Sequence, residues 1–128
     1  MSGKKVGLIC VVSVVLLAAA VALAAAVKVE LLPCPAENPI EPNASGHAIL
    51  NYAQGRDKTM VEINCWGLKA DMNYTAHLKA PEGFHSIGMF TTRKNGSGNL
   101  NVDLEGDHSA HLPVAINNDA NETVLRSR

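Results

Sequence analysis

The stretch Thr59–Trp66 reads TMVEINCW and alternates between two kinds of side chain. In an extended chain, successive side chains point to opposite faces, so Val61, Ile63 and Cys65 share one face. That face is apolar, whereas the positions between them include a carboxylate and an amide. A period of two that includes β-branched residues predicts a strand that buries the Val61 face in a core.

The same alternation returns along the chain between segments that are typical of turns. Such runs occur at Gly46–Ala53, Tyr74–Lys79, Ile87–Thr92, Asn99–Leu104, Leu112–Ile116 and Thr123–Leu125. With Thr59–Trp66 included, successive runs start 11–15 residues apart, and Asn95-Gly96 is typical of a β-hairpin turn. We therefore predict an all-β fold: a small antiparallel β-sandwich of about seven strands and immunoglobulin-like type, preceded by an N-terminal hydrophobic helix.

An uncharged run of 22 residues, Val6–Val27, follows Lys4 and Lys5 near the start of the chain. A positive flank before an apolar run is typical of a secretory signal, and the small residues up to Ala26 provide a cleavage site. The run is also long enough to span a bilayer, which takes about 20 residues. Cleavage of the signal and anchoring through residues 6–27 both stay open. Either outcome predicts an extracytoplasmic domain, secreted or held in the cell membrane by one N-terminal helix.

Prolines mark the segment between the apolar run and the first expected strand. Four of them lie within residues 28–45, and proline is incompatible with a helix interior. They predict an extended, polyproline-like lead. The expected organisation is a signal peptide or signal anchor over residues 1–27, this lead over 28–45, and the β-sandwich domain over 46–128.

Two cysteines, Cys34 and Cys65, lie beyond the apolar run, which itself holds Cys10. In an oxidising compartment such a pair predicts a disulfide bond. The bridge would close a loop of about 30 residues and stabilise the fold by about 3–4 kcal/mol in the chain-entropy account. Two free thiols or a metal site are the alternatives, although no Cys-x-x-Cys spacing supports a metal.

Four Asn-x-Ser/Thr sequences follow the apolar run, with their asparagines at Asn43, Asn73, Asn95 and Asn121. In a host that glycosylates exported proteins, these asparagines are surface glycosylation sites. Asparagine is also a common turn residue in β proteins, so both interpretations stay open.

The part of the chain after the apolar run carries a slight negative charge. Without Lys4 and Lys5 it has 9 Lys and Arg against 12 Asp and Glu, which gives a net charge of about −3. This balance argues against binding to nucleic acid or to anionic lipid. The sequence has no Gly-x-Ser-x-Gly motif for a nucleophile and no phosphate-binding loop, so we expect no enzymatic activity.

Histidines are the best candidates for metal chemistry. His108 and His111 lie three residues apart in a polar loop, and His77 or His85 brought near them would complete a site for zinc or copper. Solvated loop histidines are the alternative interpretation, and the first expectation is a protein without a cofactor.

Three aromatic side chains, Trp66, Tyr52 and Tyr74, are candidates for a binding patch. The whole chain contains one tryptophan, two tyrosines and two phenylalanines. A domain with so few large aromatic side chains more often uses them in its core, and we expect that placement here.

Turn and core residues between Gly46 and Leu104 resemble a pattern seen in extracytoplasmic β-sandwich domains. The pattern includes Val61-x-Ile63, Tyr74-x-x-His77-Leu78, Gly88-x-Phe90 and Asn95-Gly96-x-Gly98. It is similar to the outer domain of anti-sigma-K-type regulators, and its central part resembles the CHRD domain and the copper/zinc superoxide dismutase sandwich. The resemblance implies the fold. It implies no metal site, because Thr75 and Lys79 stand beside His77 where the dismutases have a His-x-His pair.

These features predict an exported or membrane-anchored β-sandwich of the cell envelope. Its expected role is structural, or the binding of an envelope or extracellular partner. The alternative is a metal-binding or redox envelope protein that uses copper or zinc at its loop histidines.

Overall fold

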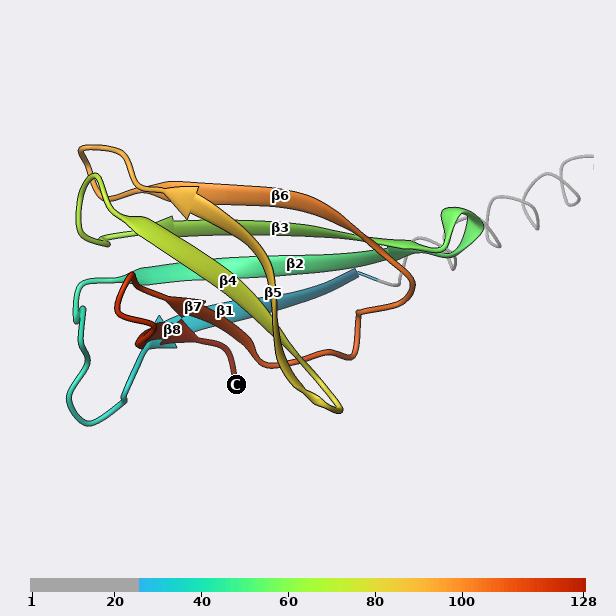
Figure 1. Ribbon diagram of the computed structural model, residues 1–128, viewed down its shortest axis with the longest axis horizontal. Helices are drawn as coiled ribbons and strands as arrows, with labels where there is room; N and C mark the ends of the chain where they lie inside the picture. Colours follow the sequence, from blue (N-terminus) through green and yellow to red (C-terminus); the bar gives the residue numbers. More distant parts are fainter. Residues whose placement is uncertain (1–25) are drawn as a thin grey trace, which may run out of the picture.

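The computed structural model describes residues 26–128 as an antiparallel all-β protein of eight strands (Figure 1). The strands are β1 (Ala26–Pro33), β2 (Ser45–Ala53), β3 (Lys58–Trp66), β4 (Asn73–Ala80), β5 (Gly83–Thr91), β6 (Gly98–Glu105), β7 (Val114–Asn117) and β8 (Thr123–Arg126). The only helix in this part of the chain is a single 3₁₀ turn, Gln54–Arg56. The all-β prediction is confirmed. The signal or anchor expected over residues 1–27 lies outside the described residues, apart from its last two.

The strands form one nearly closed sheet in the order β5-β4-β7-β8-β1-β2-β3-β6. Figure 1 shows β4 and β5 crossing in front of β2 and β3, so the sheet wraps around its own interior. The two edge strands also meet, because Gly88 of β5 lies against the side chains of Leu100 and Val102 in β6. This near-closure leaves one core inside the sheet.

The inward faces of the strands supply the core, as the alternation predicts. Val61, Ile63 and Cys65 of β3 are all at most 2% exposed. One face of β2 and one face of β4 are also buried, with Leu50 and Tyr74 at 0% and 1% exposure. The period of two therefore identified the correct side of β3, and β2 and β4 show the same alternation.

The sheet begins earlier than Gly46, inside the segment expected to be a lead. Residues Ala26–Leu31 of β1 pair with β2, and the end of the same strand pairs with β8. Val27, Val29 and Leu31 alternate with Lys28 and Glu30, and they face the core. The prolines start only at the end of the strand, where Pro33 is its last residue. This strand raises the expected number from seven to eight.

The Asn95-Gly96 turn does not form the expected hairpin. It joins β5 to β6, which lie at opposite ends of the strand order and do not pair with each other. Gly96 has φ of +80°, and its carbonyl accepts a hydrogen bond from the backbone N–H of Leu68 at 3.1 Å. The turn therefore packs against the β3–β4 connection while the chain crosses between layers.

Replacement of Gly96 by alanine is expected to lower the free energy of unfolding by about 1–3 kcal/mol, because the residue has a left-handed backbone and a Cβ would overlap the Leu68 carbonyl. Gly106→Ala is the matched control, since Gly106 has φ of +86° with open space around it. Urea unfolding of both variants separates the overlap from the backbone strain. An equal loss in the two variants would contradict the close packing at Gly96.

The structure does not contain the predicted Cys34–Cys65 disulfide, and both thiols are free. Gly46 of β2 lies between Leu31 of β1 and Cys65 of β3, so two strand spacings separate β1 from Cys65. Two spacings amount to about 9–10 Å, beyond the Cα separation of about 7 Å that a disulfide tolerates. The backbone N–H of Cys34 bonds to the carbonyl of Val124, on the far side of β1.

Burial of Cys65 makes stability depend on pH in the alkaline range. Burial raises the pKa of Cys65 from 9.0 to about 12. Above about pH 9 the unfolded thiol loses its proton while the folded thiol keeps it, so stability falls as pH rises, by up to about 1.4 kcal/mol per pH unit. Urea unfolding at pH 8, 9 and 10 is expected to show this decline in the native chain. In Cys65→Ala the decline between pH 9 and 10 should become much smaller, and a decline equal to that of the native chain would refute the assignment.

Candidate functional site

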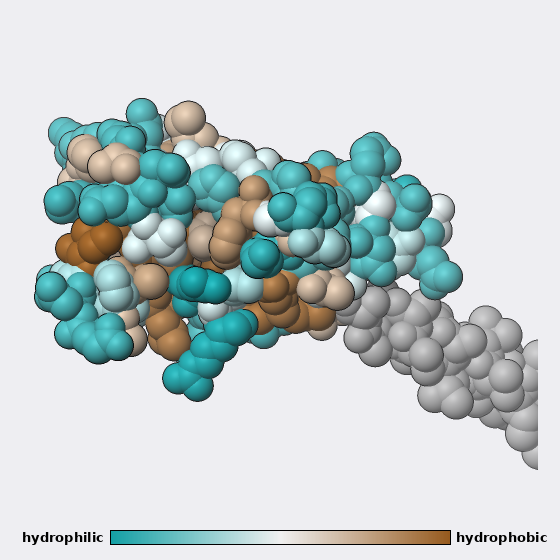
Figure 2. Space-filling model, turned by 60° about the horizontal axis from the view of Figure 1, so that its bottom comes forward, coloured by the Kyte–Doolittle hydropathy of each residue, from teal (hydrophilic) through white to brown (hydrophobic). Residues whose placement is uncertain are grey.

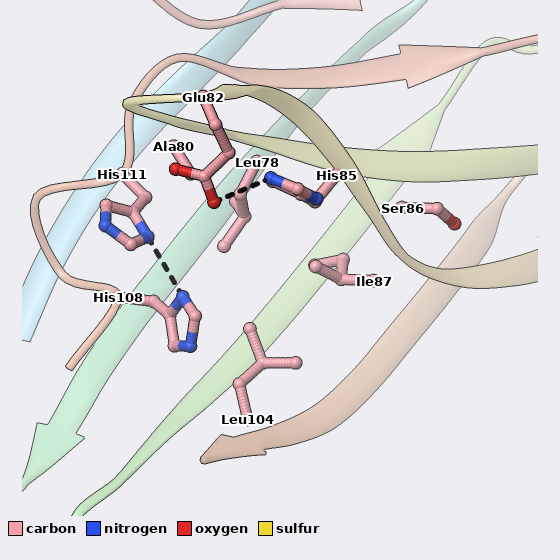
Figure 3. A pocket seen from close by; sticks show the side chains of 9 residues that line it. All are labelled: Leu78, Ala80, Glu82, His85, Ser86, Ile87, Leu104, His108 and His111. Carbon is pink, nitrogen blue, oxygen red and sulfur yellow. Dashed lines mark hydrogen bonds and ion pairs between the residues drawn. The ribbon is translucent and has the colours of Figure 1, made fainter. Parts of the chain in front are cut away.

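A pocket of about 290 Å³ lies between the β4–β5 hairpin and the loop that follows β6 (Figure 3). Three of the four histidines proposed as metal ligands line it: His85, His108 and His111. Leu78 and Leu104 are among its apolar lining residues, and Glu82 adds a carboxylate. The fold thus brings together residues that are separated by up to 33 positions in the sequence.

The loop after β6 holds His108 and His111 side by side. Their Nδ1 atoms are 2.9 Å apart, and the rings meet edge to face with centroids 4.9 Å apart. Thr59 fixes the loop from β3: its hydroxyl accepts the backbone N–H of His108 at 2.8 Å and donates to the carbonyl of Gly106 at 2.8 Å. Because Thr59 is completely buried, the histidine pair is attached to the core rather than to a free loop.

A second loop interaction stabilises the same turn. The Asp107 carboxylate accepts hydrogen bonds from the hydroxyl and the backbone N–H of Ser109, at 2.6 and 3.0 Å. These two bonds lower the pKa of Asp107 below its ordinary value. The Asp107 carboxylate is therefore bonded to Ser109 within the loop.

The β4–β5 hairpin holds the other polar pair of the pocket. Its connection is Pro81-Glu82, and Nε2 of His85 lies 2.9 Å from Oε1 of Glu82. The hydrogen bond from its own backbone N–H has the largest effect on the pKa of Glu82, which it lowers. The hydrogen bond to His85 lowers this pKa further. The sequence placed His85 in a loop, but it lies on β5, which starts at Gly83. Figure 3 shows the Glu82 carboxylate between the imidazoles of His85 and His111.

His77 does not join this pocket. It follows Ala76 at a bulge in β4 and lines a separate pocket with Phe84 and Asn117. Its Nδ1 atom is buried without a hydrogen-bond partner in the described part of the chain, and burial lowers the pKa of His77. Of the two histidines expected to join His108 and His111, His85 therefore lines their pocket and His77 does not. Within residues 26–128, no three His, Cys, Asp or Glu side chains already stand as a group of metal ligands.

The second candidate site is the outer face of β1, β2, β3 and β6 around Trp66. One row of register partners crosses this face: Glu30, His47, Asn64 and Asn99. Trp66 follows Asn64 on the same side of β3 and is 47% exposed. We name these five residues the Trp66 face.

Neighbouring groups hold the side chains of the Trp66 face in place. The His47 ring lies 5.3 Å from the Trp66 ring, centroid to centroid. The amide of Asn64 is 3.3 Å from Nε2 of His47, and Arg93 donates to Oδ1 of Asn99 at 2.9 Å. An exposed indole therefore stands beside an ordered row of polar groups.

The expectation that all three large aromatic candidates lie in the core is correct only in part. Tyr74 is buried, whereas Trp66 is exposed and Tyr52 is half-buried, with its hydroxyl donating to Asp57 at 2.7 Å. The signal for Trp66 was present in the alternation, because Trp66 shares its strand face with Glu62 and Asn64.

The surface of the domain is polar between small apolar patches. Figure 2 shows hydrophilic side chains over most of one side, with hydrophobic ones gathered in separate areas. All four sequence positions proposed for glycosylation are exposed: Asn43, Asn73, Asn95 and Asn121. No helix within residues 26–128 is long and apolar enough to cross a bilayer.

The fold and the two candidate sites define a small antiparallel all-β protein with a pocket lined by three histidines and an outer face that carries an exposed tryptophan. No protein-family model, curated protein or solved structure matches the chain.

Proposed function

We propose that this chain is an exported, non-enzymatic β-sandwich of immunoglobulin-like type that binds a polysaccharide at the cell surface through the Trp66 face. The observation that carries the proposal is the exposed indole of Trp66 beside the row Glu30, His47, Asn64 and Asn99. The signal-like N-terminus and the four glycosylation sequences support an extracytoplasmic location, secreted or anchored in the membrane.

The chemistry of the Trp66 face fits a sugar chain. A pyranose ring presents an apolar face of C–H groups, which packs on a flat aromatic ring, and a rim of hydroxyl groups. An amide side chain both donates and accepts hydrogen bonds, as a hydroxyl group does. Trp66 supplies the aromatic ring, and Asn64 and Asn99 supply amides on neighbouring strands. A row across several strands suits an extended polymer more than a compact ligand.

A protein partner fits the same face less well. The centres of protein interfaces are depleted in charged residues and enriched in large apolar ones. Here Trp66 stands beside amides, and Glu30 and Glu62 lie on the same outer side. A protein partner that binds through Trp66 would overturn the polysaccharide assignment, although the Trp66 face would still be a binding surface.

Trp66→Ala is expected to weaken binding to an oligosaccharide by at least about fivefold, because stacking of this kind contributes about 1 kcal/mol or more. Binding is measured on an immobilised panel of gluco-, manno-, xylo- and chito-oligosaccharides with the full chain. Met60→Ala is the matched control, since Met60 is 38% exposed on the same face of β3, six residues before Trp66. Retention of none of these sugars by the native chain, or equal losses in both variants, would refute the proposal.

A further inference from the structure

We propose that the pocket of Figure 3 binds one divalent transition-metal ion, of the zinc type, through His108, His111, His85 and Glu82. The site is separate from the Trp66 face, so the two proposals stand or fall independently. The argument starts from the protonation of the His108 ring.

The hydrogen bonds of His108 determine which of its nitrogens carries the proton. Nε2 of His108 lies 2.7 Å from the carbonyl oxygen of Glu105, which can only accept a hydrogen bond. Nε2 therefore holds the proton, and Nδ1 has a free lone pair that accepts Nδ1–H of His111 at 2.9 Å. Histidines that bind metals usually donate their other ring N–H to a carbonyl or carboxylate in this way, because the bond fixes the tautomer and the ring orientation.

The spacing of the two Nδ1 atoms is close to that of two metal ligands. Zinc–nitrogen bonds of about 2.0–2.1 Å at a tetrahedral angle separate the two nitrogens by about 3.3–3.4 Å. The observed 2.9 Å therefore needs to open by only a few tenths of an ångström. His111 would release its Nδ1 proton to solvent and keep or gain one at Nε2. A small rotation of the two rings, both partly exposed, is enough to widen the gap between the Nδ1 atoms.

His85 and Glu82 complete the set from the opposite side of the pocket. They now bond to each other, with Nε2 of His85 and Oε1 of Glu82 2.9 Å apart. Both side chains are exposed, so neither is locked in that pair. Figure 3 places the Glu82 carboxylate between the two histidine groups. In the structure His108 contacts His111, and His85 contacts Glu82. The bound ion would draw the two pairs together as one set of ligands. Imidazole and carboxylate donors suit zinc and copper.

The test is titration of the full chain with Zn²⁺ against a chromophoric chelator, with native mass spectrometry to count the ions. The native chain should take up one Zn²⁺. His85→Ala should weaken binding by at least about tenfold, and because His85 is exposed, this variant leaves the fold intact. The double replacement of His108 and His111 by alanine should abolish uptake. A circular dichroism spectrum checks folding of each variant.

His77→Ala is the matched control, since His77 lines a different pocket. Its affinity for Zn²⁺ should equal that of the native chain. Cys34→Ala should also bind normally, because Cys34 is the more accessible of the two described thiols and lies outside the pocket. Failure of the native chain to bind Zn²⁺, or equal weakening in His77→Ala and His85→Ala, would overturn the proposal.

Discussion

Tyr74→Ala is expected to lower the free energy of unfolding more than any other single replacement considered for this chain. Tyr74 is 1% exposed, and its ring stacks on Phe90 with centroids 5.8 Å apart. Removal of a buried aromatic ring costs about 3–5 kcal/mol. Loss of the hydroxyl adds about 1–3 kcal/mol, because a buried carboxylate loses its partner. Small domains have only about 5–15 kcal/mol of stability, so this variant should be close to unfolded at 37 °C.

The carboxylate in question belongs to Glu41, which is 6% exposed. The Tyr74 hydroxyl lies 2.8 and 3.0 Å from its two oxygens, and the backbone N–H of Lys69 donates to Oε1 at 2.9 Å. Burial, and then the hydrogen bond to Glu41, raise the pKa of Tyr74 above its ordinary value. The phenol therefore stays protonated as the donor. The stability that depends on this proton is present below about pH 10 and is lost as pH rises above it.

Tyr74→Phe isolates the hydroxyl from the ring. Its expected cost is about 1–3 kcal/mol by urea unfolding at pH 7. Tyr52→Phe is the matched control, because the Tyr52 hydroxyl bonds to Asp57 at an exposed position, where such pairs contribute less than about 1 kcal/mol. Equal and small losses in the two variants would show that Glu41 does not depend on Tyr74 for its burial.

Leu50→Ala is the second large effect expected. Leu50 is 0% exposed, and in the sheet it stands between Val27 of β1 and Val61 of β3. Its truncation leaves a cavity in the core and should lower the free energy of unfolding by about 2–5 kcal/mol.

The neighbouring residue provides the control for Leu50. Ile49 points to the opposite side of β2, where it pairs with Lys28 and Glu62. Ile49→Ala should cost only about 1 kcal/mol, since Ile49 is half-buried on the outer face. Because a shift of one residue exchanges the two faces of a strand, the reverse order of the two losses would contradict the register of β2.

The period of two predicted which face of a strand is buried, because the pattern is local and depends only on alternation. It assigned Val61, Ile63 and Cys65 correctly. The prolines concealed β1, since their effect on the backbone outweighed the short alternation Val27-x-Val29-x-Leu31. The strand order could not be predicted, because β1 joins β8, and β3 joins β6, through contacts between distant parts of the chain.

The candidate sites were predicted less completely than the fold. His108 and His111 were placed together because three residues in one loop keep them close in any fold. The approach of His85 and Glu82 depends on the β4–β5 hairpin, whose position follows from tertiary packing. The exposure of Trp66 was missed because composition was given more weight than the face that alternation assigns to it.

The most direct test of the proposed function uses the fluorescence of Trp66, the only tryptophan in the chain. Its indole is now half-exposed, so emission should be that of a partly solvated tryptophan and acrylamide should quench it. Saturation with an oligosaccharide retained on the panel should shift the emission to shorter wavelength and reduce quenching. Binding of that oligosaccharide with unchanged Trp66 emission and quenching would contradict the assignment of the Trp66 face as the binding surface.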